Sequence, residues 1–289
     1  MPTTDAANLI SFQGYPGAYS DMACGDAYPE MTSLPCRSFD DAFAAVRDGR
    51  AALAMIPIEN SVAGRVADIH HLLPNSGLRI IAEHFMRVNH QLLGVAGARI
   101  EDLTHVHSHI HALGQCRNLI QELGLTPVEH VDTAGAAADV AAGGDITQAA
   151  ISSRLAAKLD GLVTLRSDIE DAEHNTTRFV IMAHDPEPAD ASTPNLMTSF
   201  VFRVRNVPAA LYKALGGFAT NGVNMTKLES YLRGDFVAAQ FYAEVEGHPN
   251  DDGLRLALEE LNFFTHQVTL LGTYPAHPYR AEQAGNHGD

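Results

Sequence analysis

The chain has 289 residues, of which 46% are hydrophobic and 19% are charged, enough for two ordinary domains with hydrophobic cores. Its 19 basic and 35 acidic side chains give a formal net charge of −16, which argues against binding to nucleic acid or to an anionic membrane. Neither a basic, apolar leader nor a run near the roughly 18 apolar residues of a membrane span is found. We therefore expect a cytoplasmic protein, and its three cysteines, which form no C-x-x-C pair, are expected to be reduced.

Short β-rich runs alternate with alanine-rich helical patterns over the first two thirds of the chain. This rhythm is typical of a largely parallel α/β architecture. Strands are expected at 9–13, at 52–60 with an end at Pro57, at 78–88, at 90–96, near 105, 128 and 149, and at 178–183. Helices are expected at 17–27, at 38–48 with Ser38 as N-cap, and at 61–73, 108–123, 133–142 and 152–158.

A different rhythm follows residues 184–197, where three prolines and several acidic or small residues indicate a linker. After it, the patterns predict a βαββαβ order, which is typical of an α+β ferredoxin-like sandwich with an antiparallel sheet. The elements are a strand at 198–205, a helix from Pro208 to Thr220, strands at 224–232 and 236–246, a helix at 250–263 and a strand at 266–273. The polar tail after Tyr279 is expected to be frayed.

Four histidines alternate with other residues in T-H-V-H-S-H-I-H: His105, His107, His109 and His111. On one continuous strand their imidazoles would share a face and could hold a metal ion. Ser108 is a favoured N-cap residue at a strand-to-helix junction, and a helix that begins there sets His109 and His111 about 200° apart around its axis. We therefore expect no metal here, but a helix N-terminus that suits an anion.

Polar residues of a matching kind stand at four junctions between strands and helices. The segments are F-x-G-x-x-G-x-Y-S at Phe12 to Ser20, P-I-E-N-S at Pro57 to Ser61, V-x-S-H with a later Q-C at Val106 to Cys116, and T-R-F at Thr177 to Phe179. In this order, and with a βαββαβ module after them, they closely resemble the motifs of prephenate dehydratase with a C-terminal ACT domain. The resemblance covers roughly residues 8 to 275.

The resemblance implies an α/β catalytic domain of two lobes, like a periplasmic binding protein, with the active site in the cleft between them. The expected boundaries are 8–184 for the catalytic domain (lobes at about 8–86 with 166–184, and 87–165), 185–197 for the linker, 198–275 for the ACT domain and 276–289 for the tail. The implied activity is that of a carbon–oxygen lyase in phenylalanine biosynthesis, which converts prephenate to phenylpyruvate, CO2 and water. Neither a cofactor nor a metal is needed.

Residue by residue, the resemblance makes Thr177 the catalytic group, with Glu59, Asn60 and Ser61 placed to orient it or the substrate. A threonine hydroxyl is a weak acid, so we expect it to donate a hydrogen bond to the departing oxygen. The expected substrate-binding residues are Arg178, Ser108, Gln115, Asn175 and Phe179, with the Arg178 guanidinium pairing with a carboxylate.

The residues alone leave structural alternatives open at several of these positions. Thr177 is also a β-branched residue at the entry to a strand, and Arg178 could be a surface arginine at a strand edge. Asn60 or Ser61 could cap a helix, and Gln115 could be an exposed helical residue.

The βαββαβ module is expected, from the same resemblance, to bind L-phenylalanine as an allosteric effector at a dimer interface. The matching positions are Asn206, Val207, Pro208, Ala209, Ala210 and Leu211 before and in the first helix, and Leu228, Glu229 and Ser230 on the second strand. Ala209 stands where glycine is common in the family, and its methyl could narrow the pocket. Exposed sheet edges favour pairing of chains, so a homodimer or homotetramer is expected.

Two other functions fit the same sequence. Arogenate dehydratase performs the same elimination on the amino-acid analogue of prephenate, and a non-catalytic protein could close two lobes on a small anion. A dinucleotide fingerprint is absent, because F-Q-G-Y-P-G lacks the third glycine and the later acidic partner.

Overall fold

The computed structural model describes residues 6–205, 207–232 and 238–286. The chain forms two compact units, one made of Met1–Val66 and His84–Phe179 and the other of Ala67–Glu83 and Val180–Asp289. Within the described ranges, no helix is long and apolar enough to cross a membrane.

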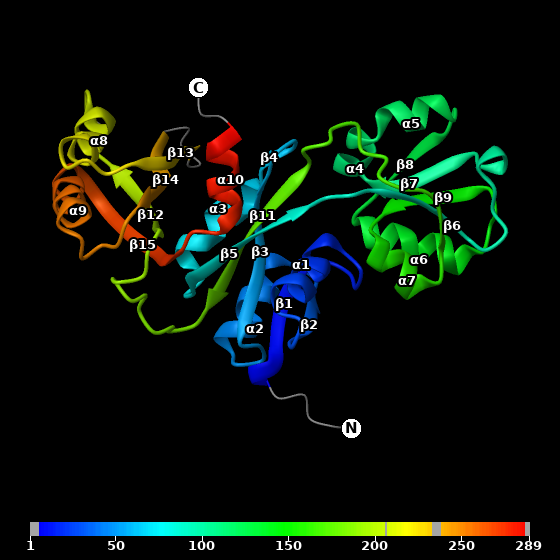
Figure 1. The fold of residues 1–289 in the computed structure, drawn as a ribbon, viewed down its shortest axis with the longest axis horizontal. Helices are drawn as coiled ribbons and strands as arrows, with labels where there is room; N and C mark the ends of the chain where they lie inside the picture. Colours follow the sequence, from blue (N-terminus) through cyan, green and yellow to red (C-terminus); the bar gives the residue numbers. More distant parts are fainter. Residues whose placement is uncertain (1–5, 206, 233–237, 287–289) are drawn as a thin grey trace. The chain divides into compact units, whose positions relative to one another are not determined.

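The first unit contains two β-sheets that define two α/β lobes (Figure 1). In the first sheet the strand order is β2-β1-β3-β11-β5, with β4 paired to β3, and β1 runs parallel to both β2 and β3. The unit boundary falls within β5 and β11. The elements of this lobe are η1 (Ala6–Asn8), β1 (Leu9–Gln13), α1 (Tyr19–Ala27), β2 (Thr32–Cys36), α2 (Phe39–Arg47), β3 (Leu53–Asn60), β4 (Gly64–Arg65), β5 (Arg79–Arg87) and β11 (Thr176–Ala183).

The second sheet of this unit has the order β10-β6-β9-β7-β8, with β7 parallel to β8 and β9. Helices α4 and α5 lie on one side of this sheet and α6 and α7 on the other (Figure 1). An apolar cluster that includes Leu92, Val106, Leu113 and Ile151 forms the core between helices and strands. The elements are β6 (Gln91–Gly94), η3 (Ile100–Asp102), β7 (His105–His109), α4 (Ile110–Gln115), α5 (Arg117–Glu122), β8 (Thr126–His130), α6 (Thr133–Gly143), β9 (Gln148–Ser152), α7 (Arg154–Asp160) and β10 (Val163–Arg166).

Most predicted elements of the first unit are confirmed, including the N-cap of α2, where the Ser38 hydroxyl accepts a hydrogen bond from the Asp41 amide at 3.1 Å. The prediction for 52–73 was wrong in two respects. Strand β3 continues past Pro57 to Asn60, and no helix begins at residue 61. Instead Asn60 Oδ1 accepts hydrogen bonds from the amides of Val62 and Ala63, which makes a turn into β4 before α3 (Ala67–Leu72) begins.

The expected helix N-cap at Ser108 was also wrong. Ser108 lies within strand β7, and His109 is the N-cap of α4, its ring nitrogen Nδ1 accepting from the His111 amide at 3.3 Å. The predicted helix at 108–123 is divided into α4 and α5 at Cys116. Strand β7 therefore extends to His109, two residues beyond His107, where the strand was expected to end.

The second unit contains an antiparallel sheet with the order β13-β14-β12-β15, and its elements follow the predicted βαββαβ order. Helices α8 and α9 pack together on one face of this sheet (Figure 1). Every second residue of β12, Phe200, Phe202 and Val204, points into their core. The elements are α3 (Ala67–Leu72), η2 (Leu73–Asn75), β12 (Leu196–Val204), α8 (Ala210–Thr220), β13 (Met225–Leu232), β14 (Ala238–Glu246), α9 (Asp252–Phe264), β15 (Thr265–Pro275) and α10 (Pro278–Asn286).

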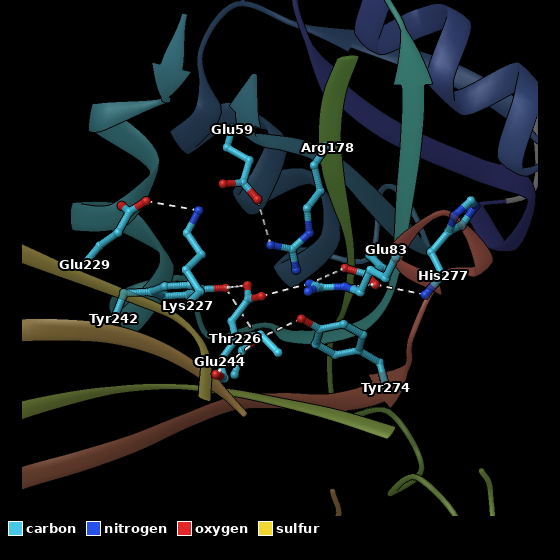
Figure 2. Close-up of polar contacts among 12 residues, drawn as sticks. Glu59, Glu83, Arg178, Thr226, Lys227, Glu229, Tyr242, Glu244, Tyr274 and His277 are labelled. Atoms are coloured by element: carbon cyan, nitrogen blue, oxygen red, sulfur yellow. Dashed lines mark hydrogen bonds and ion pairs between the residues drawn. The ribbon is translucent and has the colours of Figure 1, made fainter. Parts of the chain in front are cut away.

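The C-terminal tail is not frayed over its described residues, because it forms helix α10. Arg280 of this helix contacts Glu83 through Nε at 2.6 Å and Glu244 through Nη2 at 2.8 Å, and both carboxylate side chains are fully buried. The Glu83 carboxylate also accepts from the His277 amide, and the Tyr242 hydroxyl donates to Glu244 (Figure 2). One guanidinium therefore compensates two buried acids, which explains why a polar tail is ordered.

Candidate active site

The catalytic candidate Thr177 lies beside Asn60, where β11 begins and β3 ends. The Asn60 amide nitrogen donates to the Thr177 hydroxyl oxygen at 3.0 Å and to Asn175 Oδ1 at 2.7 Å. Both hydrogens of this amide are thereby used. Thr177 is 9% exposed, and within the described part of the chain Asn60 is the hydrogen-bond partner of its hydroxyl. Because the oxygen accepts from Asn60, the hydroxyl hydrogen can be donated elsewhere.

The same network reaches the second lobe through Gln115 at the end of α4. Asn175 Nδ2 donates to Gln115 Oε1 at 3.0 Å, and the Gln115 amide nitrogen lies 3.5 Å from Asn60 Oδ1. Gln115 is half-buried and Asn175 is fully buried. Four predicted site residues from three distant parts of the sequence, Asn60, Gln115, Asn175 and Thr177, thus form one hydrogen-bonded network.

Two further members of the network, His90 and Tyr19, were not predicted as site residues. His90 Nε2 lies 2.8 Å from Gln115 Oε1, and His90 Nδ1 lies 2.7 Å from the Tyr19 hydroxyl oxygen. Burial lowers the pKa of His90 and raises the pKa of Tyr19 well above its usual value. Both side chains are therefore neutral at neutral pH, and the network consists of uncharged donors and acceptors.

Arg178 and Glu59 form an ion pair, with Arg178 Nη1 3.0 Å from Glu59 Oε1 (Figure 2). The Arg178 side chain is 2% exposed and lies over the Phe85 ring, 5.8 Å from its centroid. Arg178 is therefore buried and is not a surface arginine at a strand edge, the alternative that the sequence left open. Its predicted role toward a substrate carboxylate stays a prediction.

Ser61, Ser108 and Phe179 make contacts of a structural kind. The Ser61 hydroxyl donates to the His174 carbonyl at 2.6 Å and accepts from the Thr176 amide at 2.9 Å, which fixes the entry of β11. Ser108 is fully buried, and its hydroxyl donates to the Ile151 carbonyl at 2.6 Å. Phe179 is 1% exposed within the core. The structure does not bring these three side chains into the network of Thr177.

A groove of about 880 Å³ adjoins the network at Gln115. Its apolar part could hold a ring or a chain, and its polar part includes the Gln115 amide. The lining residues are Val62, Ala63, Ile110, His111, Leu113, Gly114, Gln115, Arg117, Ile120, Gln121, Gly124, Leu125, Pro127 and Glu129.

The histidine row lies along β7 and the start of α4. His107 Nε2 faces Gln148 Oε1 at 2.8 Å, and the rings of His109 and His111 lie 5.1 Å apart. Among the described residues no group of three or more histidine, cysteine, aspartate or glutamate side chains could hold a metal ion. Burial raises the pKa of Cys116, so this residue behaves as a packing thiol behind Gln115.

The predicted effector-binding residues lie in the second unit, except Asn206, which lies outside the described residues. Val207 and Pro208 precede α8, and Ala209 takes a left-handed conformation with φ of +62° as its N-cap. Helix α8 therefore begins at Ala210, two residues after the predicted Pro208. Leu211 packs against the core of the module, and Leu228, Glu229 and Ser230 lie on β13, at one end of the strand order.

The fold and the network together define a two-lobed α/β protein with an uncharged polar site where its lobes meet, followed by a βαββαβ module. The sequence model of the family "Prephenate dehydratase" matches residues 10–187. The chain belongs to the prephenate dehydratase family, a family of lyases.

Individual relatives agree with this family. A bifunctional N-acyl-homoserine lactone acylase/prephenate dehydratase of Komagataeibacter europaeus is 55% identical over 94% of this chain and 97% of its own length. Arogenate dehydratase/prephenate dehydratase 1 of Arabidopsis thaliana is 38% identical over 94% of this chain and 73% of its own. The crystal structure of prephenate dehydratase from Arthrobacter aurescens in complex with L-Phe is 28% identical, with a TM-score of 0.85 over 96% of this chain and 97% of that one.

Proposed function

We propose that the protein is a prephenate dehydratase, which expels the ring hydroxyl and CO2 from prephenate to give phenylpyruvate. The observation that carries this proposal is the hydrogen bond from the Asn60 amide to the Thr177 hydroxyl oxygen, 3.0 Å long. It leaves the hydroxyl hydrogen to be donated to a ligand. Family membership over residues 10–187 supports the reaction class and favours an enzyme over a non-catalytic binding protein.

In this reaction the carbon–oxygen bond at the ring and the bond to the ring carboxylate both break, and the electrons of the latter bond complete the aromatic ring. The departing oxygen leaves with its electron pair and becomes water once a proton reaches it. Thr177 would stabilise this developing charge by donating a hydrogen bond, an assistance typically worth ~10² to 10⁴ in rate. Asn60 would strengthen the donor, because a hydroxyl that accepts a hydrogen bond is a better donor.

The uncharged network suits the carboxylate that departs as CO2. A cation held tightly against this carboxylate would stabilise the ground state and slow the reaction. The remote carboxylate needs a donor that stays in place, and the sequence predicts Arg178 for this role. Arg178 directly follows Thr177 on β11, so its guanidinium, paired with Glu59, points to the opposite face of the sheet from the Thr177 hydroxyl, and only kinetics decides its role. Ser108 and Phe179 would then support the site indirectly, Ser108 through its hydrogen bond to the Ile151 carbonyl and Phe179 by packing in the core.

The direct test is incubation of the purified protein with prephenate, followed by measurement of the strong absorbance of phenylpyruvate in alkali. Formation of phenylpyruvate with saturation kinetics supports the proposal. No product above the spontaneous rate in acid-free buffer would contradict it. Arogenate is assayed in parallel, because the relatives at 38% and 39% identity carry both names, and the ratio of the two kcat/KM values decides the preferred substrate.

A second candidate activity, the removal of the acyl group from an N-acyl-homoserine lactone, is favoured by one observation. The relative with 55% identity over 94% of this chain is named for both activities. The apolar groove beside Gln115 offers surface for an acyl chain. Release of homoserine lactone, measured by mass spectrometry, tests this activity independently of the prephenate assay.

We further propose that L-phenylalanine regulates the enzyme through the βαββαβ module, acting as an ACT domain. The support is the module's element order and the L-Phe complex of the Arthrobacter aurescens relative. Titration calorimetry with L-phenylalanine tests this binding. Because Ala209 holds φ at +62°, Ala209→Gly should relieve strain and open the approach to the ligand, so tighter binding is expected in that variant.

Self-association and cellular location are further proposals. We expect a homodimer or homotetramer, because β13 and β15 end the strand order of the second unit's sheet and could pair with another chain. Light scattering at assay concentration tests this expectation. A cytoplasmic location is proposed from the sequence and is tested by cell fractionation.

A further inference from the structure

His90 lies in the short connection between β5 and β6, outside every motif of the sequence. It is 2% exposed, and its backbone is held on both sides: its amide donates to Glu170 Oε2 at 2.9 Å, and its carbonyl accepts from the Ile169 amide at 3.0 Å. The imidazole meets the Tyr19 ring edge-on, with centroids 5.4 Å apart. The ring is therefore fixed in place.

The direction of each hydrogen bond in the network follows from backbone amides. The amides of Val62 and Ala63 donate to Asn60 Oδ1, so the other end of this side chain must be its amide nitrogen. That nitrogen donates to Thr177 and to Asn175 Oδ1. Because the Asn175 oxygen is thereby assigned, its nitrogen is the group that faces Gln115.

This order carries on to His90. Asn175 Nδ2 needs an acceptor, so the Gln115 oxygen, and not its nitrogen, faces both Asn175 and His90. His90 Nε2 must then carry a hydrogen. In a neutral ring Nδ1 is left to accept from the Tyr19 hydroxyl at 2.7 Å, the shorter of two contacts of this hydroxyl, whose oxygen also lies 3.1 Å from the Asn89 carbonyl oxygen. A flipped Gln115 amide would place donor against donor at Asn175. Burial lowers the pKa of His90, in agreement with a neutral ring that has one donor and one acceptor.

We propose that His90 is a positioning residue of the reaction: its Nε2–H group locks the Gln115 amide so that the Gln115 nitrogen faces Asn60 and the groove. This inference rests on the proposed prephenate dehydratase function. It gives His90 and Tyr19 a role in the reaction that acts through Gln115. His90 itself does not touch the substrate. His90 shares this task with Asn175, so loss of Nε2–H would leave Asn175 alone to hold Gln115 Oε1 and would loosen the orientation of the Gln115 nitrogen.

The kinetic test compares His90→Leu with His90→Gln. Leucine removes the donor, and we expect kcat/KM for prephenate to fall on the order of 10- to 100-fold. Glutamine can place an amide N–H where Nε2–H stood, so it should restore most of the loss. The matched control is His107→Leu, because His107 also faces a glutamine at 2.8 Å but lies outside the network, and its kcat/KM should not change.

A double-mutant cycle separates positioning from a general effect on folding. In a Gln115→Ala background, His90→Leu should cause little further loss, because the group that it orients is absent. Additive losses in the cycle, or wild-type kinetics for His90→Leu, would overturn the proposal while leaving the prephenate assay of the wild-type protein intact. Lack of wild-type turnover would instead overturn the proposed function.

Nitrogen-15 NMR of histidine-labelled protein gives a readout that needs no turnover. The His90 signals, assigned by their loss in His90→Gln, should show a protonated Nε2 and an unprotonated Nδ1 at pH 7. The reverse tautomer would contradict the assigned hydrogen-bond order even if the enzyme were active.

Discussion

Asn60 holds the hydroxyl of Thr177 from one side, with its amide nitrogen 3.0 Å from the threonine oxygen. The same side chain closes the turn between β3 and β4 through its oxygen. One residue therefore links the turn that replaces the start of the predicted helix at 61–73 to the proposed catalytic group.

Asn60→Asp separates these two functions of the side chain. A carboxylate can still accept from the amides of Val62 and Ala63, but it cannot donate to Thr177 and would compete for its hydroxyl hydrogen. We expect kcat to fall about 100-fold with near-wild-type unfolding temperature. Asn8→Asp, at an exposed position, serves as the control for the added charge. Equal kcat values for the two variants would exclude a role of the Asn60 amide.

Arg178→Gln tests the predicted role of the guanidinium toward the carboxylate that does not react: if Arg178 binds this carboxylate, the variant should raise KM more than it lowers kcat. The change also removes the ion pair between Arg178 and Glu59, so unfolding must be measured beside the kinetics. Arg166→Gln removes a surface ion pair with Glu122 and should leave KM as it is. An unchanged KM in folded Arg178→Gln would remove the carboxylate role.

Arg280→Ala should destabilise the second unit by about 3 kcal/mol, because it leaves two buried carboxylates without their shared guanidinium. Urea unfolding monitored by circular dichroism measures this loss. Arg255→Ala is the matched control, since Arg255 also pairs with two acids, Asp252 and Glu259, but at the exposed surface of α9. If both variants unfolded at the same urea concentration, the buried cluster would not order the tail.

Burial depresses the pKa of His90 in the folded protein below the ordinary value of 6.5, so the unfolded chain binds a proton more readily. Above pH 6.5 the His90 ring is neutral in both the folded and the unfolded protein. As the pH falls below 6.5 toward the lower pKa of the folded protein, the unfolded chain takes up a proton first, and the free energy of unfolding decreases. The free energy of unfolding of the wild type should therefore fall more steeply between pH 7 and pH 5 than that of His90→Gln. Parallel curves for the two proteins would show that His90 does not titrate differently on folding.

The helices and strands with a regular pattern of apolar residues could be predicted from the sequence, because this periodicity shows which side chains are buried. The strands near 9–13 and 198–205 and the capped helix at 38–48 are examples, each fixed by a local pattern of apolar residues. The errors fell where a single polar side chain decided the path. The Asn60 side chain stabilises a turn where the start of a helix was predicted, the Ser108 hydroxyl donates to the Ile151 carbonyl on a neighbouring strand, and Arg280 orders a polar tail.

Residues of the site could be predicted only where a sequence motif contains them or lies next to them. Asn60, Gln115, Asn175 and Thr177 stand in or beside such motifs, and the structure brings them together. His90 carries no local signal, because its partners Tyr19 and Gln115 are distant in the sequence and meet only in the folded chain. Similarly, no pattern in the sequence pairs Arg280 with Glu83.

The most direct measurement is steady-state turnover of prephenate by Thr177→Ala and Thr177→Ser. Alanine removes the hydroxyl that Asn60 orients, and kcat should fall by about two orders of magnitude or more with a modest change in KM, whereas serine should retain much of the activity. A Thr177→Ala enzyme that turns prephenate over at nearly the wild-type rate would contradict the assignment of this hydroxyl to the reaction.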